Sequence, residues 1–195
     1  PAHSHNQMQL KAFHTLIDLF PAIPASLSNS AGILLGPEYH FNLTRPGIGL
    51  YGGSPFDPEM DPPKLSPVAR LLAPILQIRR LQKGQQVGYG ARFSAPTDMQ
   101  IATIAYGYAD GLSRTIGANS FGWIDGQKLP LLGRVSMDLM AVDISQLAKC
   151  PKPGDFVQFF GDDLNDFASS CATEPYEILT SIGPRVKRVA QEQNK

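Results

Sequence analysis

A proline-rich stretch divides this sequence into two parts with different hydrophobic patterns. Prolines recur between Gly52 and Pro67, and proline fits neither the interior of a helix nor a central strand. Helical and strand-like patterns alternate before this stretch, whereas the signals beyond it are mostly those of β-strands. We therefore expect an α/β part over residues 1–53 and a mainly β domain over residues 54–195.

The order of elements in the first part is typical of parallel α/β folds. Apolar side chains recur at three- and four-residue spacing over residues 5–20, which predicts an amphipathic helix. Strand-like runs at residues 25–28 and 40–44 flank a short helical run at residues 31–35. This helix–strand–helix–strand order is the one that parallel α/β architectures use.

The second part carries strand signals in close succession. They fall at residues 68–81, 86–93, 99–108, 123–129, 135–144 and 156–160. The Asp125-Gly126 pair among them is a strong hairpin signal, and helical patterns follow at residues 164–173 and 176–182. We expect a β-rich domain that ends with two helices.

Composition and charge exclude several classes of protein. The chain has 17 Lys+Arg and 17 Asp+Glu, so it lacks the basic character of a nucleic-acid-binding protein. No apolar run approaches the ~20 residues of a membrane span, and the 2 cysteines are too few for a disulfide framework. The histidines have no Cys or acidic partner at metal-ligand spacing. We expect a cytoplasmic protein with no nucleic-acid, membrane or metal partner.

Two segments of the first part are candidates for a phosphate site. Residues 27–32 place small polar side chains where a strand gives way to a helix, and the Ser30 hydroxyl could bind a phosphate there. Further on, Arg45 ends a strand, and neighbouring glycines let the amides of Gly47 and Ile48 approach a ligand closely. An ordinary helix cap and a surface arginine before a tight turn are the alternatives.

A tyrosine at the end of a strand-like run is a candidate general acid or base. Tyr108 lies between a glycine and an alanine within residues 107–111, which leaves it exposed and close to the backbone. It could exchange protons if its neighbours lowered its pKa, which is ~10 when unperturbed. The alternative is a half-buried tyrosine that anchors the strand end.

Short motifs occur in succession from residue 28 to residue 180. They are Ser-Asn-Ser-Ala-Gly, Arg-Pro-Gly-Ile-Gly-Leu-Tyr-Gly, Val-Gly-Tyr-Gly-Ala, Gly-Tyr-Ala-Asp-Gly, Gly-Arg-Val-Ser-Met-Asp and Tyr-Glu-Ile-Leu-Thr. In this order they resemble the C-terminal half of alanine racemase, the pyridoxal-phosphate-dependent, fold-type III enzyme that interconverts L- and D-alanine. The resemblance covers essentially the whole chain. It implies the C-terminal end of a (β/α)8 TIM barrel over residues 1–53, followed by the β-rich domain, in a head-to-tail homodimer.

The resemblance implies a set of cofactor-binding residues in the first part. Ser30 would bind the phosphate of pyridoxal 5'-phosphate with its hydroxyl, together with the backbone amides of Gly47 and Ile48. Arg45 would face the pyridine nitrogen. Since an arginine does not readily give up a proton, it would keep that nitrogen unprotonated and weaken the ring as an electron sink.

The resemblance also implies catalytic and substrate-binding residues in the second part. Tyr108 would move a proton on one face of the substrate Cα, in the active site of the partner subunit. Met137 would offer its backbone amide to the substrate carboxylate, with Asp138 beside it. The implied reaction is a two-base racemisation of alanine that supplies D-alanine for peptidoglycan.

Some features of the family pattern have no counterpart in this chain. The family lysine that forms the Schiff base and acts as the second base lies in a Lys-Ala-x-Ala-Tyr-Gly context, which no lysine here has. We therefore expect this chain to be the C-terminal half of the enzyme, to need the N-terminal half of the barrel, and to be inactive alone. In addition, Ser26 stands where the family often has a histidine, and Pro184 replaces a tyrosine that commonly touches the phosphate.

Two other functions are compatible with the sequence. The missing lysine favours a non-catalytic module for dimerisation or ligand binding. A racemase for serine or another small amino acid is also possible, because part of the substrate pocket would be formed by residues outside this sequence.

Overall fold

The computed structural model describes residues 3–56, 60, 63–114, 116, 119–161 and 164–191. The chain divides into two compact units, Pro1–Val68 and Ala69–Lys195, and each is considered by itself. The division falls at the carboxy-terminal end of the proline-rich stretch. None of the helices in the described part of the chain has the length and apolar character needed to cross a membrane.

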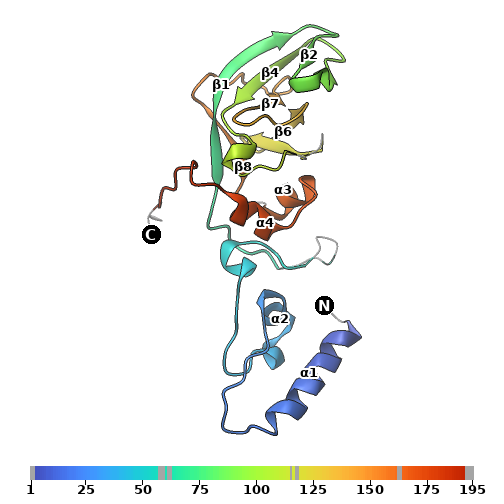
Figure 1. Cartoon of the computed structure of the whole chain (residues 1–195), viewed down its shortest axis with the longest axis vertical. Helices are drawn as coiled ribbons and strands as arrows, with labels where there is room; N and C mark the ends of the chain where they lie inside the picture. The colour runs from blue at the N-terminus through green and yellow to red at the C-terminus, as the bar shows by residue number, and fades with distance from the viewer. Residues whose placement is uncertain are drawn as a thin grey trace. The chain divides into compact units, whose positions relative to one another are not determined.

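Helices provide the regular structure of the first unit (Figure 1). They are α1 (Ser4–Ile17), α2 (Ser30–Leu35) and the 3-10 turns η1 (Pro37–Tyr39) and η2 (Ile48–Tyr51). The helix predicted at residues 5–20 is confirmed by α1, which ends earlier, at Ile17. It packs through the buried Leu10 and through Phe13, whose ring meets that of Phe41 edge-on at 4.9 Å.

The strands predicted at residues 25–28 and 40–44 are wrong. In the described part of the first unit both segments lack strand structure. The backbone hydrogen bonds between them run from the amides of Asn42, at 3.0 Å, and Leu43, at 3.3 Å, to the same Ala25 carbonyl. A parallel strand pair needs evenly spaced hydrogen bonds along its length. The chain also turns at Phe41, where φ is 53°, so the second segment cannot extend as a regular strand.

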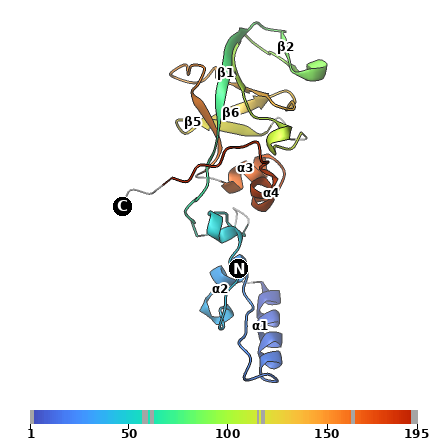
Figure 2. The same ribbon diagram turned by 60° about the vertical axis from the view of Figure 1, so that its left-hand side comes forward.

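The second unit is built on a closed barrel of antiparallel strands (Figure 1; Figure 2). In spatial order the strands are β1 (Leu71–Leu81), β4 (Met99–Ile104), β7 (Met140–Asp143), β6 (Gln127–Leu132), β5 (Phe121–Ile124) and β8 (Phe156–Phe160). A separate two-stranded sheet joins β2 (Gln86–Val87) to β3 (Phe93–Ser94). The β-rich domain predicted from the sequence is thus confirmed, and the structure specifies it as a six-stranded barrel.

One long strand closes the barrel. The first residues of β1 pair with β8, and the rest of β1 pairs with β4, with a shift in register between Ile75 and Gln77. Such a bulge bends a strand and increases its twist, which lets β1 belong to both sides of the sheet. Its inward side chains, such as Ala73 and Ile75, are buried together with Val157 and Phe159 of the neighbouring strands.

The hairpin predicted around Asp125-Gly126 is confirmed. Strands β5 and β6 are joined by these two residues, whose φ values are 49° and 77°. Positive φ at both central positions is what a type I′ turn requires. This turn fixes the register in which Trp123 faces Lys128 across the strands.

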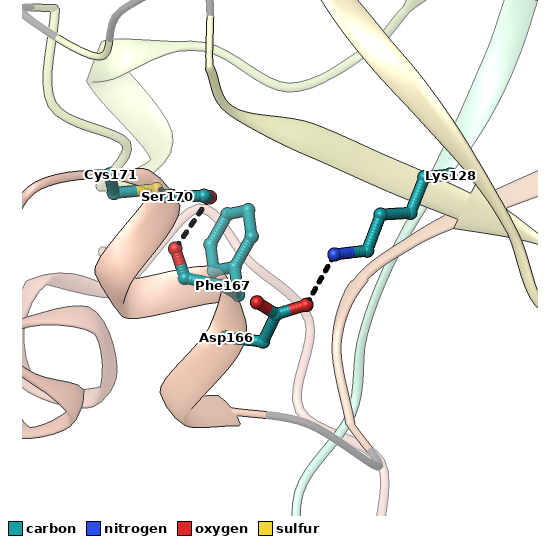
Figure 3. A network of polar contacts seen from close by, with 5 residues as sticks. All are labelled: Lys128, Asp166, Phe167, Ser170 and Cys171. Atoms are coloured by element: carbon teal, nitrogen blue, oxygen red, sulfur yellow. Dashed lines mark hydrogen bonds and ion pairs between the residues drawn. The ribbon is translucent and has the colours of Figure 1, made fainter. Parts of the chain in front are cut away.

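Two short helices, α3 (Leu164–Ser170) and α4 (Pro175–Ser181), lie beside one end of the barrel. Phe167 of α3 is buried, and its ring lies 6.1 Å from that of Phe159. At the exposed edge of this contact the Lys128 ammonium of β6 meets the Asp166 carboxylate at 2.6 Å, as Figure 3 shows. Ser170, the last residue of α3, donates from its hydroxyl to the Phe167 carbonyl at 2.7 Å.

Several predicted strands are shorter in the structure than in the sequence pattern. The run at residues 86–93 is interrupted at Gly88 and Gly90, which have φ values of 77° and 72°. The run at residues 99–108 is a strand only as far as Ile104, and its last residue, Tyr108, begins the 3-10 turn η5 (Tyr108–Asp110). These irregular segments sit at the ends of strands, where the candidate catalytic residue also lies.

Candidate functional site

The first group of candidate residues gathers around the hydroxyl of Ser30. Ser30 opens α2 and is buried, with 6% of its surface exposed. Its Oγ accepts hydrogen bonds from the amides of Gly47, at 2.8 Å, and Gly49, at 3.2 Å. Since a serine hydroxyl has two lone pairs and one proton, these bonds leave the proton free for donation to an acceptor.

The contact of Ser30 with the Gly47 and Gly49 amides joins the two segments that were separate candidates for a phosphate site. A Cβ placed on Gly49 would lie 3.4 Å from Ser30 Oγ, so residue 49 lies against the serine side chain. Ile48 begins the 3-10 turn η2 and is buried, with 4% exposed. The preceding Asn29 caps α2 by accepting from the Gly32 amide at 3.0 Å. Asn29, and not Ser30, is therefore the N-cap residue of α2.

The Arg45 side chain is bound to the segment that precedes α2. Its Nη1 donates to the carbonyl of Ser26 at 3.1 Å and also to the Ser26 hydroxyl. Its Nη2 donates to the carbonyl of Leu27 at 3.2 Å. Arg45 is an exposed residue, as the surface-arginine alternative holds, but several bonds fix its guanidinium, and Ser26 accepts two of them.

The second group of candidate residues consists of two turns in the second unit. The amide of Tyr108 donates to the Ser136 carbonyl at 3.1 Å, and the amide of Ala109 donates to the Met137 carbonyl at 2.9 Å. A Cβ on Gly107 would collide with both of these carbonyl groups. The backbone therefore places Tyr108 and Met137 side by side, as neighbours on two hydrogen-bonded turns.

The two tyrosines of the Tyr106-Gly107-Tyr108 motif have different surroundings. Tyr108 is 37% exposed, whereas Tyr106 is buried, with 4% exposed, and packs against Phe159. Burial raises the pKa of Tyr106 well above its ordinary value, and the negative charges of Asp110 and Cys171 raise it further. Tyr106 is thus a buried anchor, and Tyr108 is the more accessible of the two tyrosines.

A cavity of about 460 Å³ opens beside Tyr108. Its walls include polar side chains from the segment after η5 and from the region of α4, among them Arg114, Thr173 and Glu177. The Thr173 hydroxyl donates to the Glu177 carboxylate. The thiol of Cys171 also lines the cavity, and burial raises the pKa of this thiol, opposed by its hydrogen bonds with Ser170 and Ser120.

Arg185 is a site residue that sequence reasoning missed. Its Nη2 lies 2.7 Å from Oδ1 of Asp138, and its Nε lies 3.3 Å from Oδ1 of Asp110. The hydrogen bond with Asp138 and the charge of Asp110 raise the pKa of Arg185. Arg185 is 47 residues from Asp138 in the sequence, so no local spacing could have indicated this pair.

No group of three or more His, Cys, Asp or Glu residues suited to a metal ion is found among the described residues. Cys150 and Cys171 are both free thiols.

Comparison with known proteins identifies the family. The family model "Alanine racemase, C-terminal domain" matches residues 68–190, and "Alanine racemase, N-terminal domain" matches residues 1–55. The chain belongs to the alanine racemase family. The resemblance seen in the sequence motifs is confirmed.

Curated alanine racemases match almost the whole chain. The alanine racemase of Jannaschia sp. is 43% identical over 190 residues, which cover 96% of this chain and 53% of that protein. The "Alanine racemase, catabolic" of Mesorhizobium japonicum is 44% identical over 191 residues, covering 96% and 49%. The chain therefore spans about half the length of the curated alanine racemases that it matches.

Solved alanine racemase structures share the fold. The Bartonella henselae alanine racemase with covalently bound pyridoxal phosphate has a TM-score of 0.86 and 40% identity, and covers 96% of this chain and 52% of that one. The alanine racemase of D-cycloserine-producing Streptomyces lavendulae has a TM-score of 0.87 and 30% identity, and covers 99% and 53%. In this family context, the two groups of residues around Ser30 and Tyr108 are the candidate cofactor and catalytic sites.

Proposed function

We propose that this chain is the C-terminal half of a pyridoxal-phosphate-dependent alanine racemase, which interconverts L- and D-alanine in the cytoplasm and supplies D-alanine for peptidoglycan. The observation that carries the proposal is the hydrogen-bonded pairing of the Tyr108 and Met137 turns in a chain of the alanine racemase family. This pairing puts an exposed phenol next to a turn that can bind a carboxylate.

The residues around Ser30 fit the phosphate of the cofactor. The Ser30 hydroxyl retains its proton for an acceptor, and a phosphate oxygen is such an acceptor. We propose that the amides of Gly47 and Ile48 complete the contact with the phosphate. Pyridoxal phosphate, when bound, supplies an electron-withdrawing ring that eases loss of the Cα proton. Arg45, facing the ring nitrogen, would hold that nitrogen unprotonated.

Tyr108 and the turn beside it would act on the amino acid. Racemisation needs a base on each face of Cα, and we propose that the Tyr108 phenol moves the proton on one of them. The Met137 amide would bind the substrate carboxylate, with Asp138 next to it, so that Cα is held near the phenol. The second base would be a lysine of the N-terminal half, since no lysine of this chain has the family context.

The quaternary arrangement follows from the same proposal. Residues 1–53 would be the last part of a (β/α)8 barrel that the N-terminal half completes. Residues 54–195 would form the second domain of a homodimer in which Tyr108 enters the partner's active site. On this proposal the chain alone is inactive.

The experiment that tests the function is complementation. The purified chain is incubated with pyridoxal phosphate, alone and together with the N-terminal half of the Jannaschia relative, and exchange of the Cα proton of L-alanine with deuterated water is followed by NMR. We expect exchange and racemisation only in the mixture. The N-terminal half alone is the control, and L-serine in place of L-alanine tests substrate breadth. No rescue by a soluble N-terminal half would instead favour a non-catalytic module.

A further inference from the structure

Arg185 links the two turns of the candidate catalytic group. Its guanidinium contacts two carboxylates from different segments, Asp110 in the turn of Tyr108 and Asp138 in the turn of Met137. Each contact uses a different nitrogen, Nε for Asp110 and Nη2 for Asp138. One side chain therefore fixes the spacing between the two turns.

At one end of this link the Asp110 carboxylate is buried, and each of its two oxygens has a partner. Its side chain is 12% exposed, and its Oδ2 accepts the Gly107 amide at 2.9 Å, so Oδ1 is the oxygen that faces Arg185. The Asp110 carbonyl accepts the Gly183 amide at 3.0 Å. The segment that carries Arg185 is thus tied to the turn of Tyr108 through both backbone and side chain.

The Asp138 end is exposed. The side chains of Asp138 and Arg185 are 53% and 51% exposed, and an ion pair of this kind contributes little to global stability. Its effect is local, because it holds Asp138 next to the turn whose Met137 carbonyl accepts the Ala109 amide. Without Arg185, the two carboxylates would lose the cation that they share, and mutual repulsion would push the turns apart.

We propose that Arg185 is a positioning residue for the racemase site. By bridging Asp110 and Asp138, Arg185 holds the turn of Tyr108 and the turn of Met137 at a fixed spacing. This inference rests on the proposed function for its catalytic meaning. Arg185 itself touches no reacting atom in this scheme; it acts through the two turns that would hold the phenol and the substrate carboxylate.

The chain offers a matched control for this role. Arg188 lies in the same segment, and its Nη2 donates to the Ile182 carbonyl at 3.0 Å. Arg185→Gln and Arg188→Gln remove the same charge from the same segment, yet only the first breaks the bridge between the turns. Arg185→Lys keeps a positive charge but lacks the planar fork that reaches two carboxylates at once.

Hydrogen exchange of the backbone amides tests the proposal in the chain itself. We expect exchange of the Tyr108 and Ala109 amides to quicken at least tenfold in Arg185→Gln and by an intermediate factor in Arg185→Lys, with wild-type rates in Arg188→Gln. Exchange at Ile101 and Val142 in the barrel should remain at wild-type rates, which shows that the fold is intact. Wild-type exchange at Tyr108 and Ala109 in Arg185→Gln would overturn the proposal.

Kinetics of the complemented enzyme test the consequence for the site. We expect Arg185→Gln to raise KM for L-alanine about tenfold, which corresponds to about 1.4 kcal/mol, and to lower kcat less. Asp138→Asn in the Arg185→Gln background should recover part of this loss, because it removes the repulsion that Arg185 offsets. Equal KM and kcat in Arg185→Gln and Arg188→Gln would overturn the positioning role.

If the wild-type mixture does not racemise alanine, the proposed function fails, whereas amide exchange still decides whether Arg185 holds the turns.

Discussion

Tyr108 and Ser136 are joined through the backbone, since the Tyr108 amide donates to the Ser136 carbonyl at 3.1 Å. This bond crosses between two turns that leave the barrel after different strands, β4 and β6. The side chain of Tyr108 takes no part in the bond and remains 37% exposed. Main-chain contacts therefore fix the position of Tyr108, whereas the exposure of its side chain leaves the phenol accessible.

Gly107→Ala should disrupt this pairing. A Cβ at residue 107 would collide with the carbonyl groups of Ser136 and Met137, so the turns must separate. We expect a loss of about 3 kcal/mol in the free energy of unfolding, the upper part of the usual range for an overpacked buried site, measured by urea denaturation. Gly183→Ala is the matched control, because its Cβ would meet its nearest atoms at 3.5 Å, an ordinary contact. Equal losses in the two variants would contradict the steric explanation.

Tyr108→Phe should separate catalysis from stability. The substitution removes a hydroxyl from an exposed ring, so we expect the urea midpoint to remain within error of the wild type. In the complemented enzyme, loss of one general base should slow racemisation roughly 10²–10⁴-fold. Loss of the Cα proton from L-alanine should slow most, as followed by exchange with deuterated water from each enantiomer. Tyr89→Phe, at a tyrosine that is 77% exposed, is the control, and normal rates in both directions for Tyr108→Phe would refute its role.

Local patterns explain how much of this molecule could be predicted. The helix over α1, the Asp125-Gly126 hairpin and the exposed Tyr108 each depend on residues close together in the sequence, and all were anticipated. The strand runs at residues 25–28 and 40–44 have strand-like composition, but a strand also needs a paired neighbour, which no local pattern supplies.

Long-range contacts explain what was missed. The register shift in β1 after Ile75 closes the barrel by joining strands from both ends of the domain, and alternation of side chains along β1 does not reveal it. Arg185 was not a candidate from the sequence, since its acidic partners Asp110 and Asp138 come close to it only in the folded domain. Charged side chains at such distances in sequence give no periodic signal.

Tyr106 should make stability fall at alkaline pH. Burial raises the pKa of Tyr106 above its ordinary value of 10.0, so the native state holds this proton more tightly than the unfolded chain does. The neutral phenol therefore contributes to the free energy of unfolding. This contribution is fully present below pH 10, and it falls by about 1.4 kcal/mol per pH unit as the pH rises above 10 toward the native pKa. Tyr106→Phe should reduce this slope in urea denaturation between pH 9 and about 11, whereas Tyr89→Phe should not. An unchanged slope in Tyr106→Phe would show that other groups govern the alkaline loss.

Ser30→Ala should weaken both the first unit and its hold on the cofactor. The substitution leaves the amides of Gly47 and Gly49 without their shared acceptor, and an unpaired buried donor costs about 1–3 kcal/mol. Faster amide exchange at these two glycines would report the structural effect in the chain itself. In the complemented enzyme, equilibrium dialysis should show weaker binding of pyridoxal phosphate, because the hydroxyl that we propose as a donor to the phosphate is gone. Ser66→Ala, at an exposed serine, should change neither quantity, and tight cofactor binding by Ser30→Ala would remove Ser30 from the phosphate site.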